Sequence, residues 1–449
     1  MRFMLHRCRT PLLLVCGACA LGPVLFAARP SVPQARPGRP AAATVAVQGV
    51  SLIDGTGAAP RDGVTILIRN GRIADVAPAG SVAPAADIIV NGRGLWAVPG
   101  LIDAHVHLSP TPWAEQVDRL RHVLEGGVTA VYDVAGDIRN VSDVARAAMA
   151  GEIASPTIYY CALMAGHAFF TDPRVVGASR GFAPGEAPWN REITPQTDLV
   201  TAVAAARGAG ATAIKLYAAL DADTVRRIAD EARKQKMRLV AHATVFPAKP
   251  SDLIAAGVNM LAHAAYLVWE GSPASTEFPK RARGDFAGVP ADGPVMEHVL
   301  VAMRDRDVAL NPTLWIFAEG HGKDDLAPLR TPWMNLVTRR AQALGVTIAA
   351  GTDDVYDESV DPLPLLHREL EVLVSGAGLT PMQALVAATR GAAHAMGAEA
   401  DRGTIADGKA ADLVLLDSNP VQDIRNTRRI RYVIKDGRIV FDAAAGRAR

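Results

Sequence analysis

Short apolar runs separated by turn residues mark both ends of the chain. Within residues 44–78, apolar runs are separated by Asp-Gly and Asn-Gly pairs, and an Asp-Gly pair separates apolar runs again within 411–442. These pairs adopt the positive backbone angles of two-residue turns, so both segments are predicted to form antiparallel hairpins. Because RNGRIADV near the start and KDGRIVF near the end are close echoes, we expect residues 44–98 and 401–442 to build one small β-sandwich domain.

The chain between these ends has a different pattern. Helical segments lie between many of its short apolar runs, and the clearest, residues 223–236, places its apolar residues on one face after Asp223, the predicted N-cap. The eight runs that favour strands are LIDAHVH, VTAVYD, TIYYC, AIKLY, LVAHA, MLAHA, ALNPT and TIAAGTD. Alternating strands and helices predict an α/β fold with a parallel sheet. Eight strands predict a closed (β/α)8 TIM barrel over residues 99–400, with catalytic groups at the C-terminal strand ends.

The first residues have the composition of a targeting segment. Residues 1–10 carry Arg2, Arg7 and Arg9, and an apolar stretch follows up to Ala28. A basic start followed by an apolar stretch is typical of a secretory signal peptide, although the stretch also approaches the length of a membrane span. We therefore predict a signal peptide or an N-terminal anchor over residues 1–28 and export to the periplasm or the medium. Residues 29–43 are predicted to be a Pro-rich linker.

Composition excludes some partners and leaves others open. The 449 residues include 47 Lys and Arg and 46 Asp and Glu, and no basic run indicates a nucleic-acid partner. Membrane contact is expected only if the N-terminal segment is retained, and homo-oligomerisation stays open. Beyond the leader, Cys161 is the single cysteine, so an internal disulfide is excluded.

Six side chains that carry chemistry lie at or near the ends of the predicted strands. They are His105, His107, Lys215, His242, His263 and Asp353. Taken singly, a histidine or aspartate there has a plainer structural interpretation, but a lysine inside an apolar strand is costly to bury without a partner. If the barrel closes, all six point into one mouth. Imidazoles and a carboxylate suit zinc or a similar divalent ion. Other histidines, such as His367, lie in helical or loop contexts and are not expected to be ligands.

The strand motifs resemble those of the metal-dependent amidohydrolase superfamily, in its imidazolonepropionase-like and Xaa-Pro dipeptidase-like branch. The resemblance rests on VPGLIDAHVHL, GVTAVYDVAG, AIKLYA, VAHA, LAHAA and AAGTDD and extends over residues 44–442. It implies two divalent metal ions, with zinc expected. His105, His107 and Asp353 would hold the more buried ion, and His242 and His263 the second. Lys215, carboxylated on its side-chain nitrogen, would bridge the two ions.

The same resemblance implies hydrolysis of a C–N amide bond by metal-activated hydroxide, with Asp353 as general base and then general acid. The expected substrate is a small amide, either an Xaa-Pro-like dipeptide or an N-acyl amino acid. His167 and Tyr217 are candidate substrate-binding residues, each balanced by a plainer interpretation as a loop histidine or a packed aromatic ring. Arg180 and Arg191 are candidates for binding a carboxylate, although exposed loop charges are the plainer interpretation.

Three alternatives remain. A cyclic-amide hydrolase of the imidazolonepropionase kind would use the same two-ion site. Deaminases of the superfamily commonly carry a glutamate three residues after the histidine of the fifth strand, where this chain has Val245 after His242. A non-catalytic binding relative would usually lack one or more ligands, whereas this chain keeps all six.

Overall fold

The computed structural model of the chain describes residues 43–78, 85–108, 111–273, 283–320 and 325–445. The predicted signal peptide or anchor, residues 1–28, lies outside the described residues, as does all but the last residue of the predicted linker. Among the helices of the described ranges, none is both long and apolar enough to cross a membrane.

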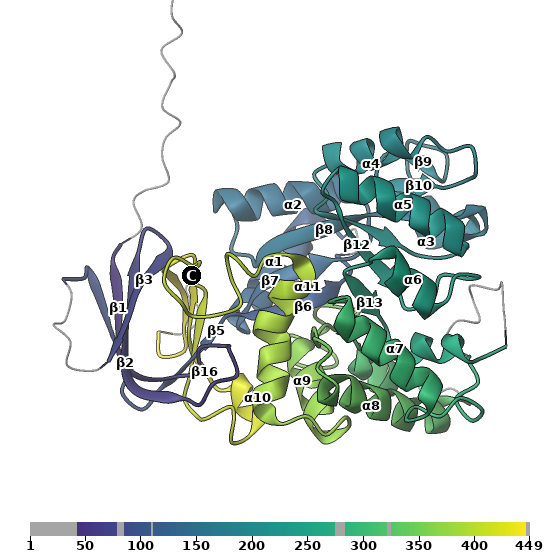
Figure 1. Ribbon diagram of the computed structural model, residues 1–449. Coiled ribbons are helices and arrows are strands. Elements are labelled where there is room, and N and C mark those ends of the chain that lie inside the picture. The colour runs from purple at the N-terminus through teal and green to yellow at the C-terminus, as the bar shows by residue number, and fades with distance from the viewer. Residues whose placement is uncertain (1–42, 79–84, 109–110, 274–282, 321–324, 446–449) are drawn as a thin grey trace, which may run out of the picture. The chain divides into compact units, whose positions relative to one another are not determined.

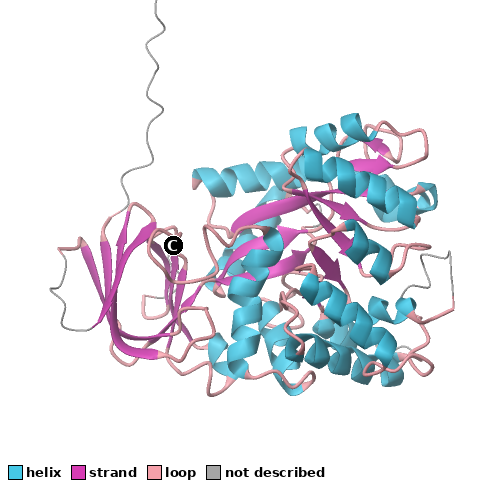
Figure 2. Ribbon diagram, in the orientation of Figure 1, coloured by secondary structure: helices cyan, strands magenta, loops and turns pink. Residues whose placement is uncertain are grey.

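Within the described residues, seven parallel strands and one irregular segment form the barrel, which can be followed in Figures 1 and 2. The strands, in order around the barrel, are β6 (Leu101–Val106), β7 (Val128–Asp133), β8 (Thr157–Ala165), β11 (Ala213–Leu216), β12 (Arg238–His242), β13 (Met260–Ala262) and β14 (Ala309–Asn311). The predicted eighth strand, TIAAGTD, is reduced to a parallel bridge between Ile348 and Leu310. It still closes the barrel, because the Ala104 amide donates to the Ala350 carbonyl at 2.9 Å.

Helices surround these strands (Figure 2). They are α1 (Trp113–Glu125), α2 (Ile138–Ala150), α4 (Leu199–Gly208), α5 (Ala222–Lys234), α6 (Pro250–Ala256), α7 (Pro294–Asp305), α8 (Ala327–Ala343), α9 (Leu366–Ser375), α10 (Pro381–Val386) and α11 (Ala392–Met396). The helix predicted over residues 223–236 is α5, and its apolar face is buried. Its predicted N-cap is wrong: Asp221, not Asp223, accepts the hydrogen bond from the Thr224 amide. Asp223 instead lies in the first turn and pairs with Arg226.

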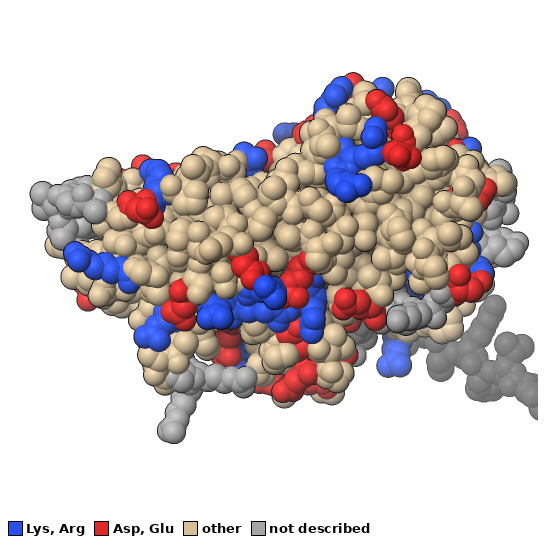
Figure 3. All heavy atoms as spheres, turned by 90° about the horizontal axis from the view of Figure 1, so that it is seen from below, with Lys and Arg blue, Asp and Glu red and all other residues tan. Residues whose placement is uncertain are grey.

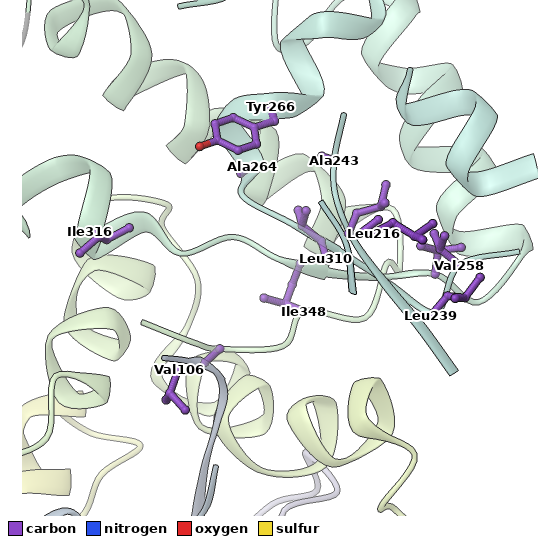
Figure 4. Packing of buried hydrophobic residues seen from close by; sticks show 14 of the residues in the cluster. Val106, Leu216, Leu239, Ala243, Val258, Ala264, Tyr266, Leu310, Ile316 and Ile348 are labelled. Carbon is purple, nitrogen blue, oxygen red and sulfur yellow. The ribbon is translucent and has the colours of Figure 1, made fainter. Parts of the chain in front are cut away.

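The alternation of side chains along β11 decides what each of its residues faces. Ile214 and Leu216 belong to the large apolar cluster between strands and helices, in which Leu216, Leu239 and Val258 gather (Figure 4). Ala213 belongs to a separate cluster that contains residues from most of the barrel strands. Since side chains along a strand alternate between its two faces, Lys215 points the same way as Ala213, into the barrel.

Both ends of the chain contribute to one mixed sheet. Its strands are β1 (Val45–Leu52), β2 (Arg61–Arg69), β3 (Arg72–Pro78), β4 (Ile88–Asn91), β5 (Trp96–Pro99), β15 (Leu413–Leu416), β16 (Ile430–Lys435) and β17 (Arg438–Asp442). Strand β5 joins the two ends, because it pairs in parallel with β1 and antiparallel with β15. The sheet has its own buried apolar cluster. The predicted fold class, a barrel with a small β-domain built from both terminal segments, is therefore confirmed.

The segment after β8 extends the barrel at its C-terminal end. It contains η1 (His167–Thr171), α3 (Pro173–Ala178), β9 (Glu186–Ala187) and β10 (Asn190–Glu192). Strand β7 pairs with β8 as far as Tyr160, and β10 then pairs with β8 from Leu163 onward. Elsewhere, on the face drawn in Figure 3, basic side chains lie among acidic ones.

Candidate metal centre

The end of β6 carries the first two candidate ligands. His105 is fully buried and His107 is partly exposed. Their ring centroids lie 5.4 Å apart, and the Nε2 atom of each ring lies 3.0 Å from the same carboxylate oxygen, Oδ1 of Asp353. The pairing of β6 with β7 shifts register between Asp103 and Val106. Such irregularities commonly re-aim side chains beside active sites.

Asp103 ties the segment that carries Asp353 to β6. This buried carboxylate accepts hydrogen bonds from the amides of His105 and Thr352, both at 3.1 Å, and from the Thr352 hydroxyl at 2.8 Å. Burial raises its pKa well above the usual range of an aspartate, although these bonds oppose the shift. Thr352, the residue just before Asp353, is thus held in place by two hydrogen bonds to the Asp103 side chain.

Gly351 lets this segment pass close to β6. A Cβ atom at that position would lie 2.6 Å from Asn311 Nδ2 and 2.7 Å from the His105 amide nitrogen, which no larger residue could accommodate without displacing the ligands. Two residues later, Asp353 has a φ of +62°, a left-handed conformation uncommon for residues with a side chain. Strained backbone of this kind clusters at functional sites.

His242 and His263 complete a row of imidazoles. The centroid of the His263 ring lies 4.9 Å from that of His105 and 4.9 Å from that of His242. His263, like Asp353, has a positive φ, +71°. Among the described residues, the donor atoms of His105, His263 and Asp353 all lie within 4.8 Å of one another, close enough to share a metal ion. The structure therefore brings together the five predicted imidazole and carboxylate groups.

The second nitrogen of every ring is held by a hydrogen bond to a group outside the row. Nδ1 of His105 lies 2.7 Å from Asn311 Oδ1, and Nδ1 of His263 lies 2.9 Å from Thr313 Oγ1. Nδ1 of His107 and Nδ1 of His242 each lie 2.9 Å from a main-chain carbonyl, of Ala135 and of Tyr217. A carbonyl can only accept, so it keeps the proton on Nδ1 and leaves the Nε2 lone pair for a ligand. This donor set fits a divalent cation.

Lys215 is fully buried and points into the barrel. The pKa of His105 falls to about 4, mainly because of burial, and the Lys215 charge lowers it further, while Asp353 opposes the shift. His105 is therefore neutral near pH 7, as a metal ligand must be. Burial tends to raise the pKa of Asp353, but His105 and His263 outweigh burial and hold it well below its ordinary value.

The two candidate substrate-binding residues differ in environment. Tyr217 is almost buried, and its ring centroid lies 4.3 Å from that of Phe169 and 4.1 Å from that of His242. The His167 side chain is 82 % exposed, and its Nδ1 lies 3.1 Å from Glu192 Oε1. Tyr217 thus adjoins the imidazole row, whereas His167 contacts an acidic residue of β10. Roles for both in substrate binding stay predictions.

A cleft of about 630 Å³ leads away from this row. His107 and Tyr217 line it, together with apolar side chains such as Phe169 and Val175, and Arg174 and Arg180 contribute charge to its wall. The other predicted arginine, Arg191, donates to the Glu186 carbonyl at 3.4 Å. Of the two arginines flagged in the sequence, Arg180 is the one that lines the cleft.

Sequence reasoning missed the residues that orient the ligands. Asp103, Asn311 and Thr313 are buried, and each hydrogen-bonds to a candidate ligand. Asn311 and Thr313 belong to ALNPT, a predicted strand whose end carries no histidine. A polar residue at the end of an otherwise apolar barrel strand was the signal that could have found them.

The chain is similar in sequence to known proteins. A family described as the amidohydrolase family matches residues 96–440. Adenine deaminase from Chelativorans sp. (strain BNC1) is 27% identical over 361 residues, which cover 78% of this chain and 50% of that protein. Imidazolonepropionase from Symbiobacterium thermophilum is 34% identical over 114 residues, 25% of this chain and 26% of that protein. The chain thus spans at most half the length of these curated relatives in the matched regions.

The fold also matches solved structures. The crystal structure of a Xaa-Pro dipeptidase with bound methionine in its active site has a TM-score of 0.69 and 21% sequence identity, and the match covers 89% of this chain and 100% of that one. At this identity the likeness concerns the fold alone.

Proposed function

The chain belongs to the amidohydrolase family, and on that premise we propose that it hydrolyses a C–N amide bond of a small molecule at a centre for two divalent metal ions. The observation that carries the proposal is the imidazole row: all four Nδ1 atoms are engaged by groups outside the row, and the two Nε2 atoms of His105 and His107 converge on Asp353. A purely structural cluster has no reason to direct its lone pairs inward.

Six side chains would hold the ions, zinc in our expectation. His105, His107 and Asp353 would bind one, His242 and His263 the other, and Lys215 would bridge them as a carbamate. The Lys215 ammonium would first lose a proton, and the neutral amine would then take up carbon dioxide and release a second proton, so a buried cation would become a carbamate anion. The complete burial of Lys215 supports this role. Such ions lower the pKa of water and polarise a carbonyl.

Asp353 has the properties of a proton carrier in this reaction. The neighbouring imidazoles keep its pKa well below the ordinary value, so the carboxylate is ionised at neutral pH. It would accept a proton from the attacking water and deliver it to the leaving nitrogen, as general base and then general acid. His105, held neutral by burial, stays available as a ligand throughout.

We propose a dipeptide, Xaa-Pro-like, or an N-acyl amino acid as substrate. The cleft beside His107 and Tyr217 has apolar walls and includes Arg180. A guanidinium binds carboxylates in a bidentate manner, and the carboxylate of such a substrate would meet it there. Arg174 lines the same cleft but is paired with Asp172 at 2.7 Å, so it serves as the matched control.

A cyclic-amide substrate is the second candidate, favoured by the stretch shared with imidazolonepropionase. The likeness to adenine deaminase is longer, but Val245, fully buried in the apolar cluster, occupies the position of the expected deaminase glutamate. Export through residues 1–28 fits an enzyme of external peptides or acyl amino acids, and sequencing the N-terminus of the mature protein tests it.

The test is a hydrolysis screen of the full-length chain with and without added Zn²⁺, over dipeptides, N-acyl amino acids and cyclic amides, alongside metal analysis by mass spectrometry. We expect about two bound ions per chain and release of free amino acids. Arg180→Ala should lower kcat/KM for carboxylate substrates by about 10-fold or more, and Arg174→Ala should not. Turnover of cyclic amides alone would replace the substrate class, and a folded chain without metal would contradict the proposal.

A further inference from the structure

A buried carboxylate outside the imidazole row has an unusual pair of partners. Glu369, on α9, is fully buried. Its Oε1 accepts the Leu314 amide at 3.0 Å and its Oε2 accepts the Trp315 amide at 2.7 Å. Burial raises the pKa of Glu369 to about 7, although these two bonds oppose the shift. Since burying a carboxyl group is costly, its position calls for a physical reason.

The two amides belong to the start of a helical turn. Leu314 and Trp315 lead into the π-helical segment η4 (Ile316–Gly320). The first amides of a helix have no partner within the helix, so the Glu369 carboxylate provides acceptors from a distant part of the chain. The residue just before them, Thr313, has a φ of +48°, a conformation that β-branched residues rarely adopt. Glu369 therefore accepts hydrogen bonds from the two main-chain amides that immediately follow the strained residue Thr313.

Thr313 contacts the imidazole row directly. Its Oγ1 lies 2.9 Å from Nδ1 of His263. The His263 amide also donates to the Asn311 carbonyl at 2.8 Å, so the end of β14 and His263 are joined at two points. A shift of the main chain at residues 314–315 would move the Thr313 hydroxyl and free the His263 ring to rotate.

We infer that Glu369 is a positioning residue for His263. By holding the Leu314 and Trp315 amides it fixes Thr313, and Thr313 fixes the ring so that its Nε2 faces the other ligands. The path runs from Glu369 through the main chain and the Thr313 hydroxyl to one ligand. This inference rests on the proposed function, because it assigns the His263 Nε2 atom to a metal ion.

Four variants of the full-length chain test the path. Glu369→Gln replaces one accepting oxygen by an NH₂ group, which leaves one of the two amides without an acceptor. Thr313→Val removes the hydroxyl and keeps the shape. The double variant combines them. Glu371→Gln is the matched control, because Glu371 lies on the same helix and pairs with Arg428 instead.

The readout is Zn²⁺ affinity of metal-free protein, measured by competition with a chromophoric chelator, with circular dichroism to establish folding. We expect Glu369→Gln and Thr313→Val each to weaken the binding of one equivalent by about 10-fold or more, as is typical for residues that orient ligands. Glu371→Gln should bind as the wild type does. The double variant should bind about as weakly as one single variant, because both changes break the same path.

Full affinity in folded Glu369→Gln, or additive losses in the double variant, would overturn the inference. If Glu369→Gln does not fold, Glu369→Asp takes its place, because it keeps the charge and displaces the oxygens, and the same comparison with Thr313→Val applies. A wild-type chain that binds no Zn²⁺ would instead contradict the proposed function.

Discussion

Two buried ionic clusters of this chain use their charges in different ways. The β-domain cluster consists of Arg402, Asp412 and Lys435, all nearly buried. Asp412 faces Arg402 Nη1 at 2.7 Å through Oδ2 and Lys435 Nζ at 3.3 Å through Oδ1. Each charge lies opposite a charge of the other sign, and both carboxylate oxygens are engaged. Such a cluster holds strands together and offers nothing to a ligand.

The barrel-mouth cluster consists of the four imidazoles, Lys215 and Asp353. Here a single carboxylate oxygen lies 3.0 Å from two ring nitrogens, and the outer nitrogens bond to groups that lie outside the cluster. Among the described residues, the donor atoms of His105, His263 and Asp353 lie within 4.8 Å of one another. Burial is common to both clusters, so what distinguishes a candidate metal site is that several donor atoms gather around one point.

Of the variants considered, Asp353→Asn in the barrel-mouth cluster should have the largest effect, and the effect should be on turnover. The amide cannot act as a general base and is a poorer metal ligand, so we expect kcat to fall by about 10⁴-fold, the upper end for loss of acid–base catalysis. In metal-free protein the free energy of unfolding should change little, since the site is built for a ligand. Steady-state kinetics and urea unfolding measure the two quantities. A variant with near wild-type turnover would remove Asp353 from the mechanism.

The equivalent change in the other cluster should act on stability. Asp412→Asn removes the anion that Arg402 and Lys435 share. Each cation keeps a second carboxylate, Asp401 at 3.0 Å and Asp436 at 2.8 Å, so we expect a cost of about 3 kcal/mol of unfolding free energy, the lower end for a broken buried pair. The kcat of the folded fraction should be unchanged, because the cluster has no catalytic role. Urea unfolding, with activity scaled to folded protein, measures both. A large loss of kcat at unchanged stability would contradict the structural assignment.

The ligands could be predicted from the sequence because strand ends are local features. His105, His107 and Lys215 were identified from the period of two along apolar strands and from the cost of burying an ammonium group. The groups that orient them could not be identified in this way. Glu369 lies in an amphipathic helix, where an acidic residue ordinarily faces solvent, and only the tertiary fold brings it to the amides of residues 314 and 315.

Tertiary contacts also limited the prediction of individual strands and helix ends. The eight apolar runs predicted the barrel, but TIAAGTD forms only one bridge. Its residues are diverted by contacts that sequence spacing does not show: Gly351 packs against β6, and Thr352 bonds to Asp103. The N-cap of α5 moved from Asp223 to Asp221 for a simpler reason, because both aspartates precede the apolar face and either could cap it.

Removal of the metal should also distinguish variants of the two clusters, by how much unfolding free energy each variant loses. An ion that binds only the folded chain stabilises it by about 2.7 kcal/mol when its free concentration is 100 times its Kd. A chelator should therefore lower the unfolding free energy of the wild type by about that amount for each ion removed, and abolish hydrolysis. Asp412→Asn should lose the same increment, whereas Asp353→Asn should lose less. Equal losses in the wild type and Asp353→Asn would show that the ion binds elsewhere.

His367 differs from the four candidate ligand histidines because both of its ring nitrogens are hydrogen-bonded to the protein, and its variant should have the smallest effect. Nδ1 lies 2.9 Å from Thr427 Oγ1 and Nε2 lies 3.0 Å from the Gly126 carbonyl, which leaves no lone pair for an ion. Burial lowers its pKa to about 4, against the opposing bond to Gly126. The unfolded chain, with a histidine pKa of about 6.5, binds the proton more readily.

The sign of the pH effect follows from that difference. Because the folded pKa is the lower one, stability is complete above about pH 6.5 and is lost as the pH falls toward 4. Between pH 7 and pH 5 this histidine should cost the wild type about 2 kcal/mol of unfolding free energy. His367→Gln removes the titrating group, so urea unfolding in the presence of a chelator should show a correspondingly shallower pH dependence. An unchanged dependence would mean that His367 has the same pKa in the folded and the unfolded chain, and would contradict its assignment as a buried, neutral imidazole.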